Sequence, residues 1–326
     1  MAGVIYVAFV GTLISRLAPP PGNSYLDEIV KNWTEPTAKG AFQYEWRDDF
    51  SRDIEPKNCH SHNDYWRRVP LYQALAAGCT SIEADVWLTK ENELLVGHTW
   101  RMTNANRTLR SLYLDPLANI FRQRNVTTAS TTSKEIGLFE NDPDQTTVLL
   151  IDVKGDGHEI LPVLQAQLQS FREKDWLTYY NGTDMHYGPL TVVGSGRTPF
   201  DLVQQNSRDR YVFYDAPLRS MMEPQYNYTN SYWASTNLKA AIGGTSLGHF
   251  STKQESILKQ QIQAARDKGL KSRYWDTPAW PISVRNNVWA SLMRLGVGVL
   301  NVDDLRGATR WDWDFCKVAG IRLCGK

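Results

Sequence analysis

Two histidines stand two residues apart in the segment Asn58–Trp66, which reads NCHSHNDYW. The chain holds only six histidines, and an amide and a carboxylate, Asn63 and Asp64, directly follow this pair. His60 and His62 can accept and donate protons near neutral pH, which is what general acid–base catalysis requires. The competing interpretation is a pair of polar residues at the end of a surface strand. This segment alone leaves both interpretations open.

Three carboxylates are spaced so that they can meet at one site. Glu83 and Asp85 stand two residues apart in IEADVW, so their side chains point to the same face of a strand. Asp152 lies near the end of the next apolar run, TVLLIDVK. Converging carboxylates repel each other unless a proton or a cation joins them. Oxygen donors without clustered Cys or His suit Mg²⁺, or Ca²⁺ as the alternative, better than Zn²⁺.

One further histidine and one lysine fit the same candidate site. His98 ends the short run ELLVGH just beyond the carboxylate pair, and Lys154 follows Asp152 by two positions. One histidine can take a proton from a nucleophile while a second gives one to the leaving oxygen, and a lysine can offset charge on a phosphate. This set predicts acid–base cleavage of a phosphodiester, with His98 paired to His60 or His62.

These residues stand at the ends of regularly spaced apolar runs that alternate with amphipathic helical patterns from about residue 55 onward. The runs are Pro56–His60, Ser81–Leu88, Thr147–Lys154, Leu190–Ser195, Tyr211–Ala216, Trp233–Asn237, Leu270–Asp276 and Val297–Asp303. Eight strands with intervening helices predict an α/β fold of the (β/α)8 TIM barrel type, with an open doubly wound sheet as the alternative. In such barrels the active site lies at the carboxyl ends of the strands, where the candidate residues fall.

Length and charge limit the domain organisation and the classes of partner. The 326 residues carry a formal net charge of +1, so no excess of Lys and Arg predicts nucleic-acid binding. We expect a signal peptide or membrane anchor over residues 1–22, an N-terminal extension over 23–55, and the barrel with a C-terminal tail over 56–326. The apolar run GVIYVAFVGTLI covers about half of the ~20 residues that a membrane-spanning helix needs.

Sequons and cysteines favour the secretory route. Five Asn-X-Thr sequons begin at Asn32, Asn106, Asn125, Asn181 and Asn227. Cys316 and Cys324 stand close enough in sequence to close a small disulfide loop, whereas Cys59 and Cys79 look like core residues at strand ends. We therefore expect a secreted or membrane-anchored protein, with a mitochondrial location as the alternative.

Four segments resemble a known family. CHSHNDYWRRVPLYQAL, SIEADVWL, LLVGHT and RTLRSLYLDPL occur in the order typical of the fungal altered inheritance of mitochondria protein 6 family, a group of phospholipase-C-like phosphodiesterase barrels. The chain is more distantly similar to glycerophosphodiester phosphodiesterases and sphingomyelinase D toxins. The resemblance covers roughly residue 56 to the C-terminal tail. It implies that Glu83, Asp85 and Asp152 bind a metal ion and that His98 is one of two catalytic histidines.

The toxins extend the resemblance to three further segments. LLIDVKGDG is similar to the toxin strand that carries the third metal ligand and an active-site lysine, which corresponds to Lys154. RYWD and LNVDD are similar to segments that carry an active-site tryptophan and asparagine, which correspond to Trp275 and Asn301. The resemblance therefore implies that these two residues contact the substrate.

The first strand departs from the glycerophosphodiesterase pattern His-Arg-Gly, because Ser61 and His62 follow His60. Alignment favours His60 as the catalytic histidine and leaves His62 to orient it or to contact phosphate. Asn63 and Asp64 belong to the same rim or cap the following turn.

Together these residues predict a metal-dependent phosphodiesterase, a hydrolase or a lyase, that acts on a phospholipid or a glycerophosphodiester. An attached hydroxyl is a better-placed nucleophile than free water, so the expected first product is a cyclic phosphate. One alternative is an acid–base glycosidase, which leaves the histidines and Lys154 without a role. The other is an inactive barrel that acts as a membrane or interaction protein. The loop at 219–233, which combines Met with Tyr and Trp, is the candidate for contact with a membrane surface.

Overall fold

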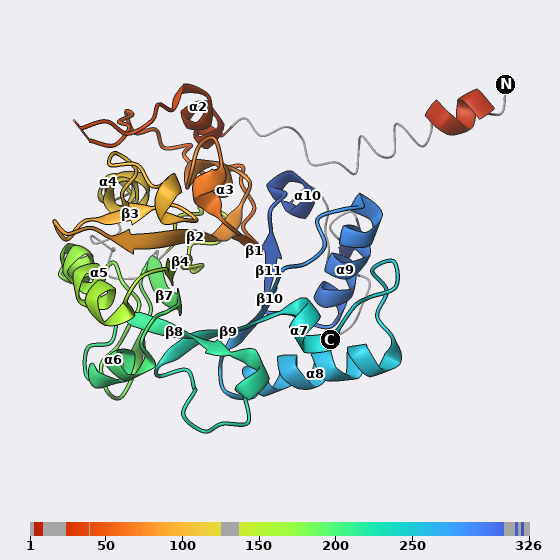
Figure 1. Cartoon of the computed structure of the whole chain (residues 1–326). Helices are drawn as coiled ribbons and strands as arrows, with labels where there is room; N and C mark the ends of the chain where they lie inside the picture. Colours follow the sequence, from red (N-terminus) through yellow and green to blue (C-terminus); the bar gives the residue numbers. More distant parts are fainter. Residues whose placement is uncertain are drawn as a thin grey trace.

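Eight parallel strands close into a barrel in this computed structural model, which describes residues 3–8, 24–38, 40–124 and 137–309 and two short strands at 317–318 and 321–322. The strands are β1 (Lys57–Ser61), β2 (Cys79–Leu88), β4 (Thr147–Val153), β7 (Leu190–Gly196), β8 (Val212–Pro217), β9 (Ser231–Asn237), β10 (Lys271–Trp275) and β11 (Val299–Val302). They follow one another in this order, and β11 pairs with β1 to close the ring (Figure 1). The predicted (β/α)8 TIM barrel is confirmed, and the open doubly wound sheet is wrong.

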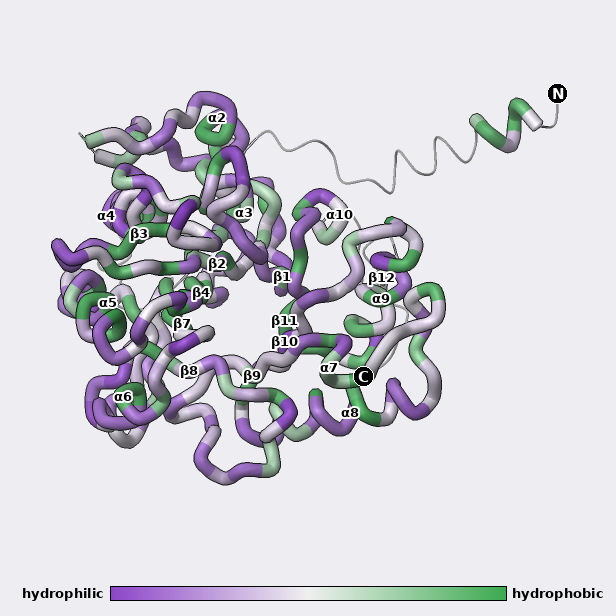
Figure 2. Tube along the Cα trace, in the orientation of Figure 1, coloured by the Kyte–Doolittle hydropathy of each residue, from purple (hydrophilic) through white to green (hydrophobic). Residues whose placement is uncertain are grey.

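Helices surround the barrel and cover its outer face (Figure 1). They are α3 (Tyr72–Ala76), α4 (Asp115–Gln123), α5 (Gly157–Arg172), α6 (Phe200–Gln205), α7 (Leu238–Ile242), α8 (Thr252–Asp267), α9 (Ile282–Arg294) and α10 (Leu305–Thr309). In α5, Ile160, Leu164 and Leu168 recur every four residues and are buried, because this spacing places them on one face of the helix. Figure 2 shows hydrophobic and hydrophilic residues alternating along α5 and α8 accordingly.

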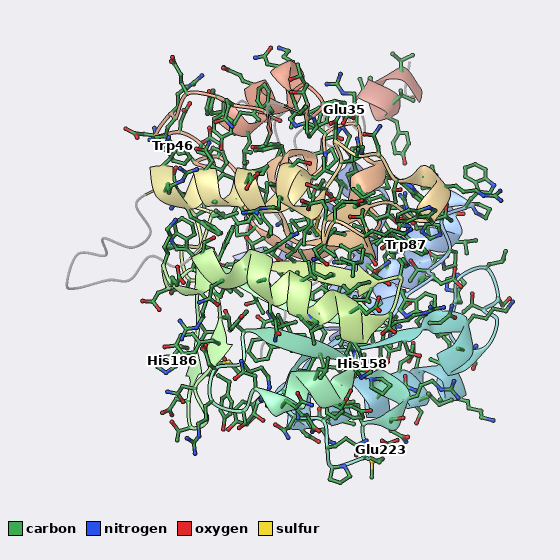
Figure 3. The ribbon with its side chains drawn as sticks, turned by 60° about the vertical axis from the view of Figure 1, so that its left-hand side comes forward. Glu35, Trp46, Trp87, His158, His186 and Glu223 are labelled. Atoms are coloured by element: carbon green, nitrogen blue, oxygen red, sulfur yellow. A yellow bond between two sulfur atoms is a disulfide. The ribbon has the colours of Figure 1, made fainter. Side chains whose placement is uncertain are left out.

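Strand direction gives the barrel two different ends. Trp87, at the carboxyl end of β2, and His186, in the hairpin of β5 (Tyr179–Tyr180) and β6 (Met185–His186), lie at opposite ends (Figure 3). At the carboxyl end, the short strand β3 (Leu94–Val96) runs antiparallel to β2 and returns the chain from the tip of β2 to the level of Asp85. That end carries the candidate site residues.

Residues 24–38 and 40–55 pack against the barrel. Helix α2 (Tyr25–Asn32) buries Leu26 and Ile29, and Trp46 stacks on the buried ring of Phe50 at a centroid distance of 4.9 Å. Residues 3–8 are helical and those with large side chains are exposed. The rest of the expected signal or anchor segment lies outside the described residues, among which no helix has the length and hydropathy needed to span a bilayer.

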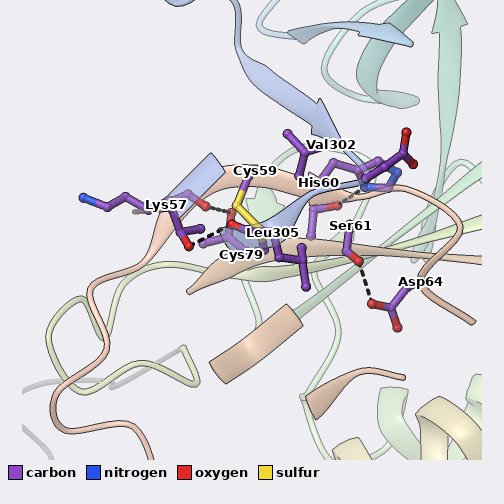
Figure 4. The surroundings of a disulfide bond; sticks show 12 residues. Lys57, Cys59, His60, Ser61, Asp64, Cys79, Val302 and Leu305 are labelled. Atoms are coloured by element: carbon purple, nitrogen blue, oxygen red, sulfur yellow. Dashed lines mark hydrogen bonds between the residues drawn. A yellow bond between two sulfur atoms is a disulfide. The ribbon is translucent and has the colours of Figure 1, made fainter. Parts of the chain in front are cut away.

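A disulfide bond joins Cys59 on β1 to Cys79 on β2, with a Cα–Cα distance of 4.9 Å (Figure 4). Both residues are buried, as the sequence predicted, but their bonding was missed because they lie 20 positions apart and this spacing does not reveal that the two strands pair. The strand register shifts between Lys57 and His60, so the bond lies beside a bulge in β1. Cys316 and Cys324 lie outside the described residues.

Candidate active site

Three carboxylates converge at the carboxyl end of the barrel. Glu83 and Asp85 alternate with apolar residues on β2, and Asp152 on β4 is the direct register partner of Asp85. One oxygen from each of the three lies within 4.8 Å of the others. Gly196 makes this approach possible, since its φ of +63° favours glycine and a Cβ there would collide with the carboxylate of Asp152.

The electrostatics of this cluster fit a hard cation. Oδ1 of Asp85 is buried and has no hydrogen-bond partner, which is unfavourable unless another group occupies that position. Burial and the neighbouring Glu83 raise the pKa of Asp85 to about 6. Lys154 offsets part of the negative charge, because its Nζ lies 3.0 Å from Asp85 and 3.2 Å from Asp152. Three carboxylate oxygens suit Mg²⁺ or Ca²⁺. In the part of the chain that the structure describes, these three acids form the one group of Asp, Glu, Cys and His side chains that are close enough together to hold a metal ion.

His98 lies beside the carboxylate cluster and is open to solvent. Its Nδ1 is 3.2 Å from Asp85 Oδ2 and 3.2 Å from the hydroxyl of Tyr65, and its side chain is 44% exposed. The ring of Trp66 packs beside the imidazole at 5.1 Å. His98 therefore has a fixed position while part of its ring stays accessible to a substrate.

Tyr65 connects several groups of the site. Its hydroxyl oxygen lies 2.7 Å from both Asn63 Oδ1 and Asp85 Oδ2, and its single hydrogen can be donated to either. Burial and the charge of Asp85 raise the pKa of this phenol far above its usual value, so it remains a donor. Sequence reasoning missed Tyr65, although its place three residues after His62 was the available signal.

His60 is wholly buried at the end of β1. Its Nδ1 lies 2.7 Å from Ser81 Oγ and its Nε2 lies 3.4 Å from Glu83 Oε2, while its ring meets the edge of Trp233. Burial lowers the pKa of His60 to about 4, so the ring is neutral at pH 7 and both nitrogens are engaged. In this arrangement His60 orients Glu83.

His62 lies nearer the surface and contacts two carboxylates. Its Nδ1 is 2.8 Å from Asp303 Oδ1, and its Nε2 points toward Glu83 Oε2 at 3.9 Å. Burial lowers its pKa, but the hydrogen bond with Asp303 and the charges of both acids outweigh burial and raise it overall. A carboxylate on one ring nitrogen fixes the tautomer and leaves the other nitrogen facing the site.

The turn after β1 is held by its own backbone, by the buried Asp64 and by the half-buried Arg67. Asn63 has a left-handed φ of 47°, which directs its backbone N–H to Glu83 Oε2 at 2.9 Å. Asp64 accepts a hydrogen bond from Ser61 Oγ (Figure 4) and a second one from the N–H of Leu71. Arg67 spans from Ser61 Oγ to the carbonyl of Asp303, joining this turn to the end of β11. The turn is therefore a rigid part of the site. Asp64 caps it, which is one of the two roles that the sequence left open, whereas Arg67 was missed as a support.

The two residues expected to contact substrate lie on adjacent strands. Asn301 on β11 is the register partner of His60 and is buried. Trp275 ends β10 and lines a cavity of about 670 Å³ with Lys239 and Asp276 among its other lining residues. The carboxylate cluster does not line this cavity. The structure thus brings His60, His62, His98, Lys154 and the acids together and places Trp275 at an adjoining rim.

Comparison with known proteins identifies the family. Residues 48–215 match the description AIM6-like phosphodiesterase domain. A relative from Arthroderma benhamiae, named altered inheritance of mitochondria protein 6 homolog, is 39% identical over 276 residues, which are 81% of this chain and 87% of the relative. The chain belongs to the AIM6-like phosphodiesterases. This confirms the family that the sequence motifs indicated.

Other AIM6-like relatives are more distant. The proteins of Eremothecium gossypii and Saccharomyces cerevisiae, both named altered inheritance of mitochondria protein 6, are 34% and 31% identical. The matches cover 77% and 78% of this chain and 68% and 70% of the relatives. A glycerophosphodiester phosphodiesterase structure from Thermotoga maritima aligns with 76% of this chain and 93% of its own, at 14% identity and a TM-score of 0.40.

Proposed function

We propose that this AIM6-like protein is a metal-dependent phosphodiesterase that cleaves a phospholipid or a lipid-derived headgroup diester. The family description supports a phosphodiesterase in general terms. The observation that carries the finer proposal is the unpaired, buried Oδ1 of Asp85, which sits among three converging carboxylates with histidines close by. A glycosidase would use two carboxylates and would need neither the third acid nor the histidines.

Glu83, Asp85 and Asp152 would hold Mg²⁺, with Ca²⁺ as the alternative. Such an ion supplies positive charge for a phosphoryl oxygen and holds the diester in place. Lys154 supplies a second positive charge, and its contacts with Asp85 and Asp152 keep its ammonium group next to the same position. Asn63 would help to position Tyr65 at the rim, because the hydroxyl of Tyr65 lies within hydrogen-bond distance of both Asn63 Oδ1 and Asp85 Oδ2.

We assign the acid–base pair to His98 and His62 on geometry. Both rings are partly exposed, at 44% and 27% of the side chain, and each has one nitrogen held by a carboxylate. His60, which alignment with glycerophosphodiesterases favours, has no exposed surface, and both its nitrogens contact protein groups. Its role in the proposal is to position Glu83.

The proposed reaction begins with attack by a hydroxyl of the substrate itself. One histidine removes the proton of that hydroxyl, its oxygen forms the new bond to phosphorus, and the other histidine protonates the leaving oxygen as its bond breaks. The product is a cyclic phosphate. An attached nucleophile favours this route because it is already held near the phosphorus atom.

A lipid surface is the proposed location of the substrate. Trp66, Trp100, Trp275 and Trp280 are all exposed, and all lie at or just beyond the carboxyl ends of strands around the site. Tryptophan is enriched where proteins meet the membrane interface. In the loop at 219–233, which the sequence indicated as a candidate for membrane contact, Met222 is 92% exposed and adds to this apolar rim.

An oxidising compartment is the proposed location of the protein. The buried bond between Cys59 and Cys79 forms and persists in such compartments, and the sequons agree with the secretory route. Asn32 and Asn106 are exposed, so both can carry a glycan on the folded surface. The names of the relatives refer to inheritance of mitochondria, which keeps a mitochondrial association as the alternative.

One experiment tests the reaction class and the mechanism together. Purified protein is incubated with a lysophospholipid, a glycerophosphodiester and an aryl glycoside, in Mg²⁺, in Ca²⁺ and in EDTA, and the products are followed by phosphorus NMR. The proposal expects metal-dependent loss of a phosphodiester and a cyclic phosphate resonance before any monoester. Immediate formation of the monoester would replace cyclisation by hydrolysis, and turnover of the glycoside alone would overturn the proposal.

A further inference from the structure

A buried guanidinium joins four neighbouring strands inside the barrel. Arg273 on β10 donates from Nε to Ser235 Oγ on β9 at 2.9 Å, from Nη2 to Asp215 Oδ2 on β8 at 3.1 Å, and from Nη1 to Asn301 Oδ1 on β11 at 3.0 Å. Ser235 in turn donates to the other oxygen of Asp215 at 2.6 Å. The guanidinium also lies 5.3 Å from the ring centre of Trp233. It is therefore held in one position by groups on both sides.

This contact determines which way the amide of Asn301 points. A guanidinium has only donors, so the amide oxygen must face Arg273 and the amide nitrogen must face away from β10. Among the described residues, Nδ2 of Asn301 donates to no protein group, and the residue is only 3% exposed. On the side away from β10 lies β1, where His60 is the register partner of Asn301. A free N–H donor is thus presented beside the candidate active site.

The ion pair between Arg273 and Asp215, which holds this amide, is buried. The side chains of Arg273 and Asp215 are each 5% exposed, so both charges have lost most of their contact with water. Such pairs often contribute little net stability compared with apolar side chains of similar size. The stability of the fold therefore does not explain this buried ion pair. A role in fixing the orientation of a polar group does explain it.

We propose that Arg273, supported by Asp215 and Ser235, is a positioning residue that locks Asn301 so that its Nδ2 donates a hydrogen bond to a non-bridging oxygen of the substrate phosphate. This inference rests on the proposed phosphodiesterase function. Arg273 itself does not touch the phosphate. It acts by excluding the flipped amide, which would present an oxygen to the anion and repel it.

The test compares turnover of a lysophospholipid, which carries the hydroxyl that the proposed reaction needs, in Mg²⁺ by wild-type protein and by the variants R273K, N301A and R273K/N301A. A lysine keeps the charge beside Asp215, but its single ammonium lacks the planar fork that reaches all three partners. We expect kcat to fall about 10- to 100-fold in N301A, which loses a hydrogen bond to a charged group, and by a similar factor in R273K. The double variant should fall no further than N301A, since both changes remove the same interaction. Additive losses would overturn the proposal.

Two further variants separate positioning from loss of folding. R273M/D215N removes both charges together, so no unpaired charge is left in the interior, and it should lower kcat like R273K. Arg210, which lies just before β8, is the matched control. It is also a buried arginine, but it donates to backbone carbonyls, including those of Val203 and Gln204, and not to Asn301. R210K should lower the melting temperature while leaving kcat of the folded protein unchanged. A kcat of R273M/D215N equal to wild type would overturn the proposal.

The side-chain amide of Asn301 gives a readout that does not need activity. Its ¹H–¹⁵N NMR signals, assigned by their loss in N301A, should be a single sharp pair in wild type and broadened or doubled in R273M/D215N. Unchanged signals would show that Arg273 does not hold the amide. If wild-type protein cleaves no phosphodiester, the proposed function fails, and these spectra still decide whether Arg273 fixes Asn301.

Discussion

Breaking the disulfide between Cys59 and Cys79 should lower the free energy of unfolding by about 3 kcal/mol. The bond joins residues 20 positions apart, and for a loop of that length the chain-entropy relation predicts a loss of about 11 cal/mol/K, or about 3.3 kcal/mol at 25 °C. Unfolding a chain of 326 residues releases about 0.7 kcal/mol/K of entropy, so the melting temperature should fall by about 5 °C. Both sulfur-bearing residues are buried, which leaves no compensating contact with water.

The assay is differential scanning calorimetry with and without reductant, in a C316A/C324A background that removes any contribution from the tail cysteines. The protein is denatured and refolded in reductant, because the buried bond is shielded in the native state. C59A/C79A is the matched control and should melt at one temperature in both conditions. A reductant-insensitive melting temperature in the C316A/C324A protein, or free thiols at Cys59 by mass spectrometry, would refute the reasoning.

Three further predictions concern the site and the compartment. Asp152→Asn should keep the fold but sharply weaken Mg²⁺ binding by calorimetry, because a charged ligand is lost; unchanged affinity would remove Asp152 from the metal site. His98→Ala and His62→Ala should each lower kcat by about 10²–10⁴-fold, as expected for a positioned acid or base. His60→Ala should act mainly through Glu83, and a larger loss in His60→Ala than in His62→Ala would return the catalytic role to His60. Endoglycosidase treatment of protein expressed in a fungal host should lower its apparent mass, and an unchanged mass would argue against the secretory route.

Local pattern was sufficient to predict the barrel and much of the site. The eight apolar runs each became a barrel strand, with ends shifted by at most two residues. The alternation in IEADVW placed Glu83 and Asp85 on one face, and strand order then brought Asp152 into register with Asp85. These features depend on a period of two along a strand and on the common direction of parallel strands, both of which are written in the sequence.

Contacts between distant strands could not be predicted in the same way. Tyr65, in the turn after β1, contacts Asp85 on the neighbouring strand β2. Asp303 contacts His62 only because β11 pairs with β1 to close the ring. An arginine in the run KSRYW was a visible signal of a buried charge, but its partner Asp215 lies 58 positions away. Spacing along the chain carries no information about such pairs.

The sequence by itself therefore determined which chemical groups stand at the carboxyl ends of the strands and, through the order of its motifs, the family. The tertiary structure decided which of those groups are exposed and which way they point. It buried His60 against Glu83, left His62 and His98 open to solvent, and turned the amide of Asn301 with Arg273. The physical reason is that desolvation and hydrogen-bond direction depend on every neighbour in space, and most of those neighbours are far apart in the chain.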